Sequence, residues 1–302
     1  MFQNFAELRA SLSADAPKVL VVASAHDKHT LEAVYEAADS LPMKYLLVGD
    51  RDKIVSISAE LGKNPGADEI IDAADDAECA AKCVELIRSG KGNVLMKGMI
   101  ETGTLLKAVL NKETGIRGTG TMSHLAMLEV PSYNKLVGVT DGGMIPHPNL
   151  EQKADIVRNA VSFFRQLGVA KPMVAVLAAA ETVSEKMPET VDAAELQVMG
   201  LRDELGDCLV EGPLSFDISV NEESAAIKKH PSKITGKVDI LLVPAVAAGN
   251  ILCKGLLYWG GAKMAGCVLG AKVPIVLVSR GASAEEKLLS IMLCLKAGQS
   301  PI

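Results

Sequence analysis

The sequence predicts an α/β fold, and three observations lead to this prediction. Short runs of Val, Ile and Leu alternate along the chain with longer segments of helical periodicity. Several of these runs, such as LLV, ILLV and PIVLV, are apolar on both faces, as in strands of a parallel sheet that helices cover. Hydrophobic residues make up 49% of the 302 residues, which is enough for a substantial core. At ~100–200 residues per domain, this length favours two domains.

The expected strands are short apolar runs bounded by residues that favour turns. In chain order they are Lys18–Ser24, Lys44–Gly49, Glu69–Asp72, Asn93–Lys97, His124–Val130, Leu136–Thr140, Met173–Ala179, Cys208–Glu211, Asp239–Val243 and Pro274–Ser279. The expected helices have longer periodic patterns and lie between the strands. In chain order they are His29–Asp39, Asp52–Leu61, Asp75–Ser89, Thr102–Lys112, Leu150–Leu167, Thr190–Met199, Asn221–Lys229, Gly249–Tyr258 and Ala284–Ala297.

Two Gly/Pro-rich segments interrupt this alternation, Asp141–Asn149 (DGGMIPHPN) and Gly212–Phe216 (GPLSF). Each is expected to form a loop. Asn149 is a candidate N-cap for the helix that follows, with Glu151 and Gln152 in the first turn. Because open α/β sheets bind ligands in the loops that follow their strands, both segments are candidate ligand loops.

Composition and charge disfavour a nucleic-acid binder. Aromatic residues make up 3% of the chain, too few for base-stacking surfaces, and the formal net charge is −6. The charge is uneven: residues 91–140 contain six Lys/Arg and three Asp/Glu, and residues 270–302 contain four and two. Two basic segments in an otherwise acidic protein are consistent with a local binding site for an anion.

The sequence gives no sign of secretion, a membrane span or a metal site. The first 18 residues are not a signal peptide, because they include acidic residues and no apolar segment. The six cysteines include no C-x-x-C pair, and Cys79 and Cys83 are interpreted as small apolar residues on a helix. No H-E-x-x-H, G-x-S-x-G or D-x-D pattern occurs, and His26 and His29 are expected in a loop open to solvent. We therefore expect a reduced, cytoplasmic protein without a metal.

Two segments have the composition of an anion site. The strand ending PIVLV leads to Ser279 and Arg280, and a helix opening at Ser283 follows. A hydroxyl, a guanidinium and the N–H groups of a helix N-terminus can all donate hydrogen bonds to an anion there. The strand NVLM likewise ends at Lys97, and a helix begins at Thr102 with small residues that let a phosphate approach the backbone. The latter segment does not match the Walker pattern, and Arg117-Gly118-Thr119-Gly120 is only a weak dinucleotide signal.

Many segments, in order along the whole chain, resemble the phosphate acetyl/butyryl transferase family. They are LEAVYEAADS (31–40), VGDRDKI (48–54), VLMKG (94–98), LLKAVLNKETGIR (105–117), GTMSHLAMLE (120–129), KMPETVDAAEL (186–196), EGPLSFDISV (211–220) and AGNILCKGL…VPIVLVSR (248–280). The length and the TMSH and MP-x-T-x-DAA stretches resemble the butyryl-type members.

The resemblance implies reversible acyl transfer: acyl-CoA and phosphate form acyl phosphate and CoA by direct transfer in a ternary complex. Coenzyme A is then a substrate, and no cofactor is needed. The implied catalytic residues are Ser279, Arg280 and a carboxylate at Glu285 or Glu286, because the Asp that often follows the Ser-Arg pair is missing here. The implied substrate-binding residues are Lys97, Thr102, Thr104, Lys107, Arg117, Asn250 and Lys254.

The resemblance also implies a fold like that of the isocitrate/isopropylmalate dehydrogenases, with two α/β domains and a cleft between them. We expect the first domain at 1–120 plus 270–302 and the second at 121–269. Family members are commonly dimers, so a homo-oligomer is expected. Three alternatives stay open: a phosphate acetyltransferase, a metal- and NAD-dependent hydroxyacid dehydrogenase on the related fold, and a non-catalytic protein that binds CoA esters or phosphate. The absence of clustered Asp ligands disfavours the dehydrogenase.

Overall fold

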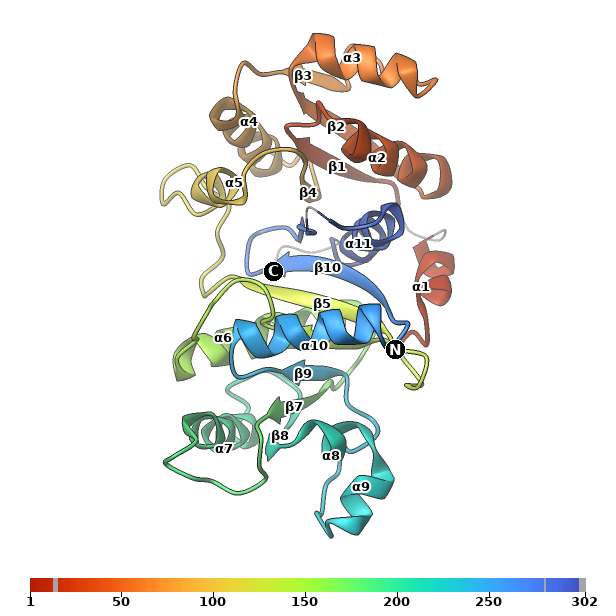
Figure 1. The fold of residues 1–302 in the computed structure, drawn as a ribbon. Helices are drawn as coiled ribbons and strands as arrows, with labels where there is room; N and C mark the ends of the chain where they lie inside the picture. Colours follow the sequence, from red (N-terminus) through yellow and green to blue (C-terminus); the bar gives the residue numbers. More distant parts are fainter. Residues whose placement is uncertain (13–15, 280, 299–302) are drawn as a thin grey trace. The chain divides into compact units, whose positions relative to one another are not determined.

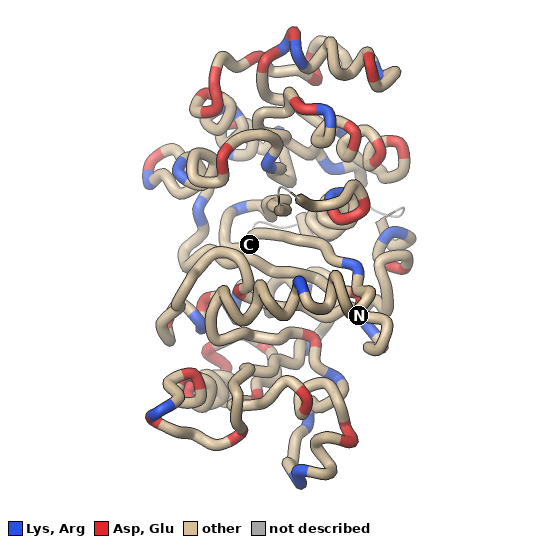
Figure 2. Tube along the Cα trace, in the orientation of Figure 1, with Lys and Arg blue, Asp and Glu red and all other residues tan. Residues whose placement is uncertain are grey.

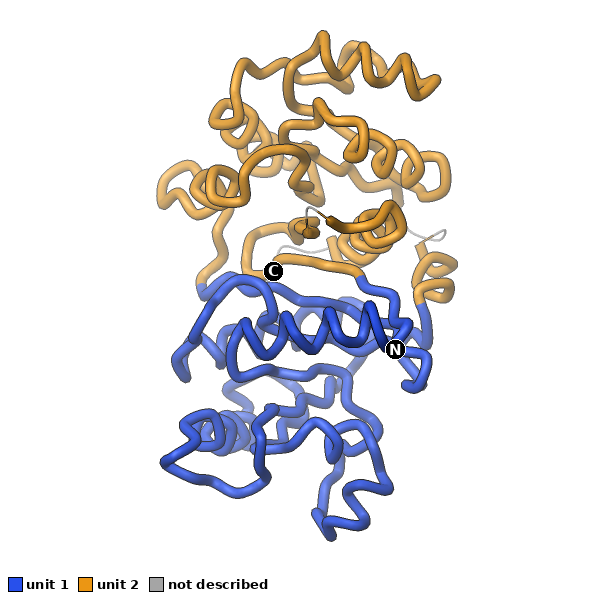
Figure 3. Tube along the Cα trace, in the orientation of Figure 1, with its two compact units in different colours: residues 1–4, 120–264 blue, residues 5–119, 265–302 orange. Residues whose placement is uncertain are grey.

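The structure is a computed structural model that describes residues 1–12, 16–279 and 281–298 (Figure 1). Contacts divide the chain into two compact units (Figure 3). Unit 1 comprises residues 1–4 and 120–264, and unit 2 comprises the described residues of 5–119 and 265–302. Each unit is an α/β structure with its own strands and covering helices.

The strands of unit 2 follow the order β3-β2-β1-β4-β11-β10. Their bounds are β1 (Lys18–Ala23), β2 (Met43–Gly49), β3 (Ile70–Asp72), β4 (Val94–Lys97), β10 (Lys263–Leu269) and β11 (Ile275–Val276). The neighbours from β3 to β11 pair in parallel, whereas β10 runs antiparallel to β11. The carboxyl ends of β1, β4 and β11 therefore meet at one edge of the sheet.

Helices cover both faces of this sheet. They are α1 (Phe5–Leu12), α2 (Lys28–Ser40), α3 (Arg51–Glu60), α4 (Asp76–Arg88), α5 (Thr102–Val109) and α11 (Ala284–Ala297). α4 packs against α5, while α11 packs against α1 and α2 on the opposite face (Figure 1). α11 is buried from Leu288 to Leu295, so this part of the chain completes the core of the unit that the first strands begin.

The strands of unit 1 follow the order β5-β6-β9-β7-β8. Their bounds are β5 (Ser123–Glu129), β6 (Val137–Thr140), β7 (Met173–Leu177), β8 (Leu209–Leu214) and β9 (Ile240–Leu242), and β5 pairs antiparallel with β6. The remaining pairs are parallel. The helices are α6 (Leu150–Gln166), α7 (Pro188–Leu201), α8 (Phe216–Val220), α9 (Glu222–Ile227) and α10 (Val246–Tyr258). No helix among the described residues is long and apolar enough to span a membrane.

Most expected elements are present within a few residues of their predicted bounds, including all ten strands. The N-cap prediction is confirmed: Asn149 Oδ1 accepts from Gln152 N at 2.9 Å, and Gln152 Oε1 accepts from Asn149 N at 3.0 Å. The expected loop at Gly212–Phe216 is wrong, because β8 continues through Leu214 and α8 begins at Phe216. The expectation of parallel strands is also corrected, since β10 and β5 run antiparallel to their neighbours.

Candidate active site

The carboxyl ends of β1, β4 and β11 open into a cavity of about 570 Å³. It is the candidate active site, and we call it the active-site cavity. Its lining comes from the loops and helix starts that follow these strands: Asp27, Lys28, His29, Thr30, Met96, Lys97, Gly98, Met99, Glu101, Val278, Ser279 and Lys287. Ala23 and Lys97 are register partners at the ends of β1 and β4. The cavity thus occupies the place in an open α/β sheet where ligands bind.

Three helices begin around this cavity, and they differ in whether a capping side chain accepts a hydrogen bond from their first N–H groups. Asp27 caps α2 by accepting from Thr30 N at 3.1 Å, and Ser283 caps α11 by accepting from Glu286 N at 3.1 Å. The N-cap of α5 is Glu101, whose side chain makes no capping hydrogen bond. Because the first N–H groups of a helix have no partner within it, the start of α5 offers donors to an anion.

At one position on this edge of the sheet, the neighbouring backbone leaves no room for a side chain. Gly98 N donates to Ala23 O at 2.9 Å, and a Cβ on Gly98 would lie 2.5 Å from that oxygen. At Gly103, in the first turn of α5, a Cβ would meet nothing within 4 Å, so this turn is open. The lack of a side chain at Gly98 therefore lets the backbone after β4 approach the end of β1, whereas Gly103 leaves room beside the start of α5.

The charge of the active-site cavity favours an anion. Its lining includes three lysines, Lys28, Lys97 and Lys287, and two carboxylates, those of Asp27 and Glu101. One of the two carboxylates already accepts the capping bond from α2. Exposed Ser279 accepts a hydrogen bond from Gly281 N at 3.4 Å, which leaves its O–H proton to donate.

The structure brings some of the predicted site residues together. Ser279 and Lys97 line the active-site cavity, and Thr102 begins α5 directly after Glu101, which also lines it. Glu285 and Glu286 occupy the first turn of α11, where Glu286 accepts from Ser283 N at 3.1 Å. Neither is among the described residues that line the cavity. Arg280 lies outside the described residues.

Other predicted residues lie elsewhere. Thr104 and Lys107 line a second cavity of unit 2, between α4 and α5. Arg117 is exposed and forms an isolated antiparallel bridge with Ala271. Asn250 and Lys254 belong to unit 1, where both are exposed on α10.

Two lysines of the active-site cavity were missed by the sequence reasoning. Lys28 is the first residue of α2, and Lys287 lies in the second turn of α11. Their position gives only a weak signal in the sequence, since each lies near the start of a helix and less than a dozen residues after a strand end. The expected loop position of His29 is wrong, because this residue belongs to the first turn of α2; its side chain is exposed as expected, and it lines the cavity.

In unit 1 the expected ligand loop after β6 is organised by a buried carboxylate. Asp141 is 2% exposed and accepts four backbone hydrogen bonds, from the N–H groups of His124, Gly143, Met144 and Ile145 at 3.0–3.1 Å. Burial lowers the pKa of His124, opposed by the charge of Asp141. The His124 Nδ1 atom is buried without a hydrogen-bond partner in the described part of the chain.

The cysteines are unsuited to covalent catalysis. All six are free and buried. Burial raises the pKa of the Cys253 thiol to about 12 and, together with the charge of Asp207, raises that of Cys208 to about 11. Because the thiolate is the nucleophile, such thiols are inert near neutral pH. No group of three or more His, Cys, Asp or Glu among the described residues is placed to hold a metal ion.

Comparison with known proteins gives the family. Residues 76–295 match the model of the phosphate acetyl/butaryl transferase family. A phosphate butyryltransferase of Clostridium acetobutylicum is 39% identical over 97% of each chain, and a phosphate acetyltransferase of Rhizobium meliloti is 40% identical over 95% of this chain and 91% of its own. A branched-chain phosphotransacylase from Enterococcus faecalis V583 superposes with a TM-score of 0.81 at 31% identity, covering 94% of this chain and 99% of that one. The chain belongs to the phosphate acetyl/butyryl transferase family.

Proposed function

We propose that the protein is a phosphate butyryltransferase, which converts butyryl-CoA and phosphate to butyryl phosphate and CoA. Family membership supports the reaction class, and both acyl types occur among relatives of similar identity. The observation that carries the proposal is the active-site cavity, where Lys28, Lys97 and Lys287 gather beside Ser279 at the carboxyl ends of the strands. Both substrates are anions, and this cavity is basic within an acidic chain.

In the proposed reaction, a phosphate oxygen bonds to the acyl carbonyl carbon, and the C–S bond to CoA then breaks. The lysines hold the phosphate, and the Ser279 hydroxyl and the Arg280 guanidinium donate to the oxyanion of the tetrahedral intermediate. A carboxylate on the first turn of α11, Glu285 or Glu286, accepts the proton that the attacking phosphate loses and gives it to the departing thiolate; in the reverse direction that carboxylate accepts the thiol proton. The high pKa of the buried cysteines supports direct transfer in a ternary complex.

One assay tests the function. Purified protein is incubated with butyryl-CoA, and free thiol is followed with and without phosphate. Phosphate-dependent thiol release is the expected result. NAD reduction with a hydroxyacid would identify a dehydrogenase instead. No thiol release and no NAD reduction would indicate a protein that binds CoA esters or phosphate without converting them.

The acyl preference gives a first prediction. With ten Phe, Tyr and Trp among 302 residues, an acyl site lined by aliphatic side chains is expected. Such a site tolerates C3–C5 acyl groups and loses rate with acetyl, because each missing methylene removes about 1–3 kcal/mol of binding. The kcat/KM for acetyl-CoA is expected to be lower than for butyryl-CoA. A value that is equal or higher would identify a phosphate acetyltransferase.

Metal independence gives a second prediction. The proposed steps need only hydrogen-bond donors, cations and a carboxylate from this chain. Treatment with a chelator followed by gel filtration is expected to leave kcat unchanged. Activity that disappears and returns with one divalent ion would contradict this prediction.

A homo-oligomer is proposed as well. Large apolar side chains are exposed along and after α10, with Ile251 72%, Tyr258 73% and Trp259 95% exposed. Figure 2 shows this helix almost free of charged positions. An apolar surface of this kind on an acidic protein is typical of an interface. Light scattering tests the proposal, and a monomeric mass would reject it.

Two further proposals concern the fold and the cellular location of the protein. We infer an isocitrate/isopropylmalate dehydrogenase-like fold with domains at 1–120 plus 270–302 and at 121–269, supported by the two α/β units and by α11 packing in the unit of the first strands. A crystal structure with substrates would test it. Six free cysteines support a reducing, cytoplasmic location, which cell fractionation would test.

A further inference from the structure

Besides its lysines, the active-site cavity has three large apolar side chains in its lining, Met96, Met99 and Val278. Met96 is buried and Val278 is half-buried, so both offer a ligand little surface. Met99 differs from them, because its side chain is 67% exposed. Met99 is therefore the apolar side chain of this cavity that a bound ligand can contact most fully.

The backbone holds Met99 in this exposed position, while the next residue, Ile100, is fully buried. Met99 N donates to Ser24 O at 3.0 Å. Ser24 has a φ of 50°, a left-handed conformation that is uncommon outside glycine, and its hydroxyl donates to Asp76 Oδ1 at 2.6 Å. These bonds fix the Met99 backbone at the ends of β1 and β4, while its unbranched thioether side chain can still adjust to a ligand.

The exposed Met99 side chain lies in the same cavity as the cations. Lys97 and Met99 are two residues apart, so their Cα atoms are separated by at most about 7 Å. Ser279 lines the cavity with them. In an acyl phosphate, one carbonyl carbon joins an anionic phosphate to an alkyl chain. A ligand whose phosphate lies beside the lysines therefore has its alkyl chain within reach of Met99.

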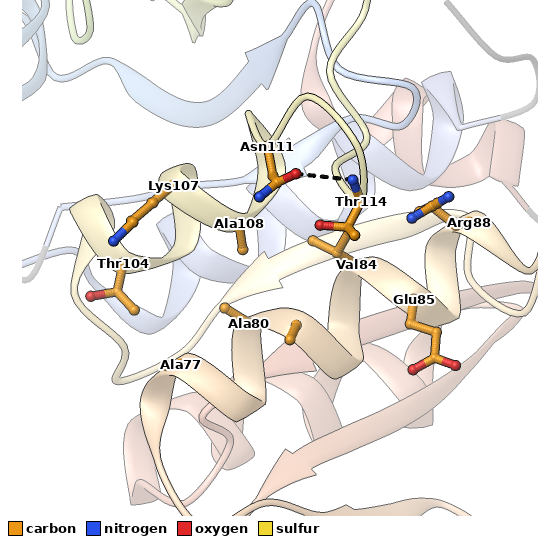
Figure 4. A pocket seen from close by; sticks show the side chains of 11 residues that line it. Ala77, Ala80, Val84, Glu85, Arg88, Thr104, Lys107, Ala108, Asn111 and Thr114 are labelled. Atoms are coloured by element: carbon orange, nitrogen blue, oxygen red, sulfur yellow. Dashed lines mark hydrogen bonds between the residues drawn. The ribbon is translucent and has the colours of Figure 1, made fainter.

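The second cavity of unit 2, between α4 and α5, does not offer this combination (Figure 4). Its apolar side chains are small, as Figure 4 shows for Ala80, Val84 and Ala108. Neither Ser279 nor Lys97 is among the described residues that line it. Because the acyl carbon meets Ser279 in the proposed reaction, the alkyl chain needs its apolar contact in the active-site cavity.

We propose that Met99 contacts the alkyl chain of the acyl group and is a residue that determines the preferred chain length. The inference rests on the proposed function for its substrate. Butyryl has two methylenes more than acetyl, and each methylene that becomes fully buried strengthens binding about fourfold. Contact of these methylenes with the Met99 side chain therefore favours butyryl, whereas the single methyl group of acetyl gains little from it.

Three variants of Met99 test the proposal with butyryl-CoA and acetyl-CoA. Met99→Ala is expected to lower kcat/KM for butyryl-CoA about 5–10-fold and that for acetyl-CoA less than about twofold. Met99→Gln keeps the length of the side chain but makes it polar, so it should lose the butyryl preference in the same way. Met99→Leu keeps an apolar side chain of similar volume and should keep the wild-type ratio. The KM for phosphate should stay unchanged in all three, because the lysines are retained.

Leu110→Ala is the matched control, since it truncates another exposed apolar side chain, 44% exposed at the end of α5, that does not line the active-site cavity. It should leave the ratio of the two kcat/KM values unchanged. An unchanged ratio in Met99→Ala would overturn the assignment. Equal losses with both thioesters and a raised KM for phosphate would also overturn it, because they would show that the variant displaces the loop.

Calorimetry with methylphosphonate and butylphosphonate separates this inference from the proposed function, because these anions carry alkyl chains of different length and need no turnover. If the wild-type protein is inactive but binds butylphosphonate more tightly, and Met99→Ala loses this difference, the Met99 assignment stands and the proposed function fails. If the wild-type protein is active but Met99→Ala keeps both the difference in phosphonate binding and the acyl ratio, the Met99 assignment alone fails.

Discussion

Arg280→Ala is expected to lower kcat for transfer between butyryl-CoA and phosphate by ~10²–10³-fold, or about 3–4 kcal/mol of transition-state stabilisation. Arg280 lies outside the described residues, but it directly follows Ser279, which lines the active-site cavity. Negative charge develops on the carbonyl oxygen as phosphate attacks, and a guanidinium offers two parallel N–H donors to an anion. Arg280→Lys should recover only part of the loss, because an ammonium group cannot make the paired hydrogen bonds.

Steady-state kinetics on folded variants distinguishes this role from that of a solvated turn residue. If Arg280 only solvates a turn, its alanine variant should retain kcat and change the free energy of unfolding by about 0.5 kcal/mol or less. Lys272→Ala is the control, because it removes an exposed cation from the same basic segment away from the active-site cavity. A near-wild-type kcat and KM for phosphate in Arg280→Ala would remove the Ser279–Glu286 turn from the catalytic site.

The strands were predictable where their apolar runs are long and have polar boundaries. β1, β2 and β4 belong to this class, since their buried positions follow the Val/Leu runs in the sequence. β10 was missed because its sequence, KMAGCVL, contains small residues and lies in a Gly-rich segment. Its Gly266 N donates to Ser290 Oγ on α11 at 2.8 Å, so tertiary packing holds a strand that local propensity does not favour.

The lining of the active-site cavity was predictable in part for a physical reason. Ser279 and Lys97 each end a predicted strand, and parallel strands bring their carboxyl ends to one edge. Lys28 and Lys287 were not predictable in the same way, because their side chains reach the active-site cavity only through the direction in which α2 and α11 leave the strands. The sequence also marked Asp141 only as the start of a Gly/Pro-rich loop, since its partners are backbone groups of the folded loop and of His124.

Asp141→Ala is expected to lower the free energy of unfolding by about 3–5 kcal/mol, because four backbone N–H groups lose the buried carboxylate that accepts from all of them. Asp141 Oδ1 accepts from His124, Gly143 and Met144, and Oδ2 accepts from Ile145. Asp141→Asn can keep its oxygen at the three-bond position while its NH₂ group faces Ile145 N. It should therefore cost less, about 1–3 kcal/mol, because only one of the four hydrogen bonds is lost.

Urea denaturation measures these losses, and hydrogen exchange at the amides of residues 143–145 locates them. Asp207→Ala is the control, because it removes the same charge from an exposed ion pair with Lys171 at 3.5 Å, and such pairs contribute about 0–1 kcal/mol. Faster exchange should be confined to the loop in Asp141→Asn and should extend to β6 in Asp141→Ala, since Thr140 directly precedes the lost acceptor. If Asp141→Ala unfolds at the same urea concentration as Asp207→Ala, other groups satisfy the four donors, and the carboxylate does not hold this loop.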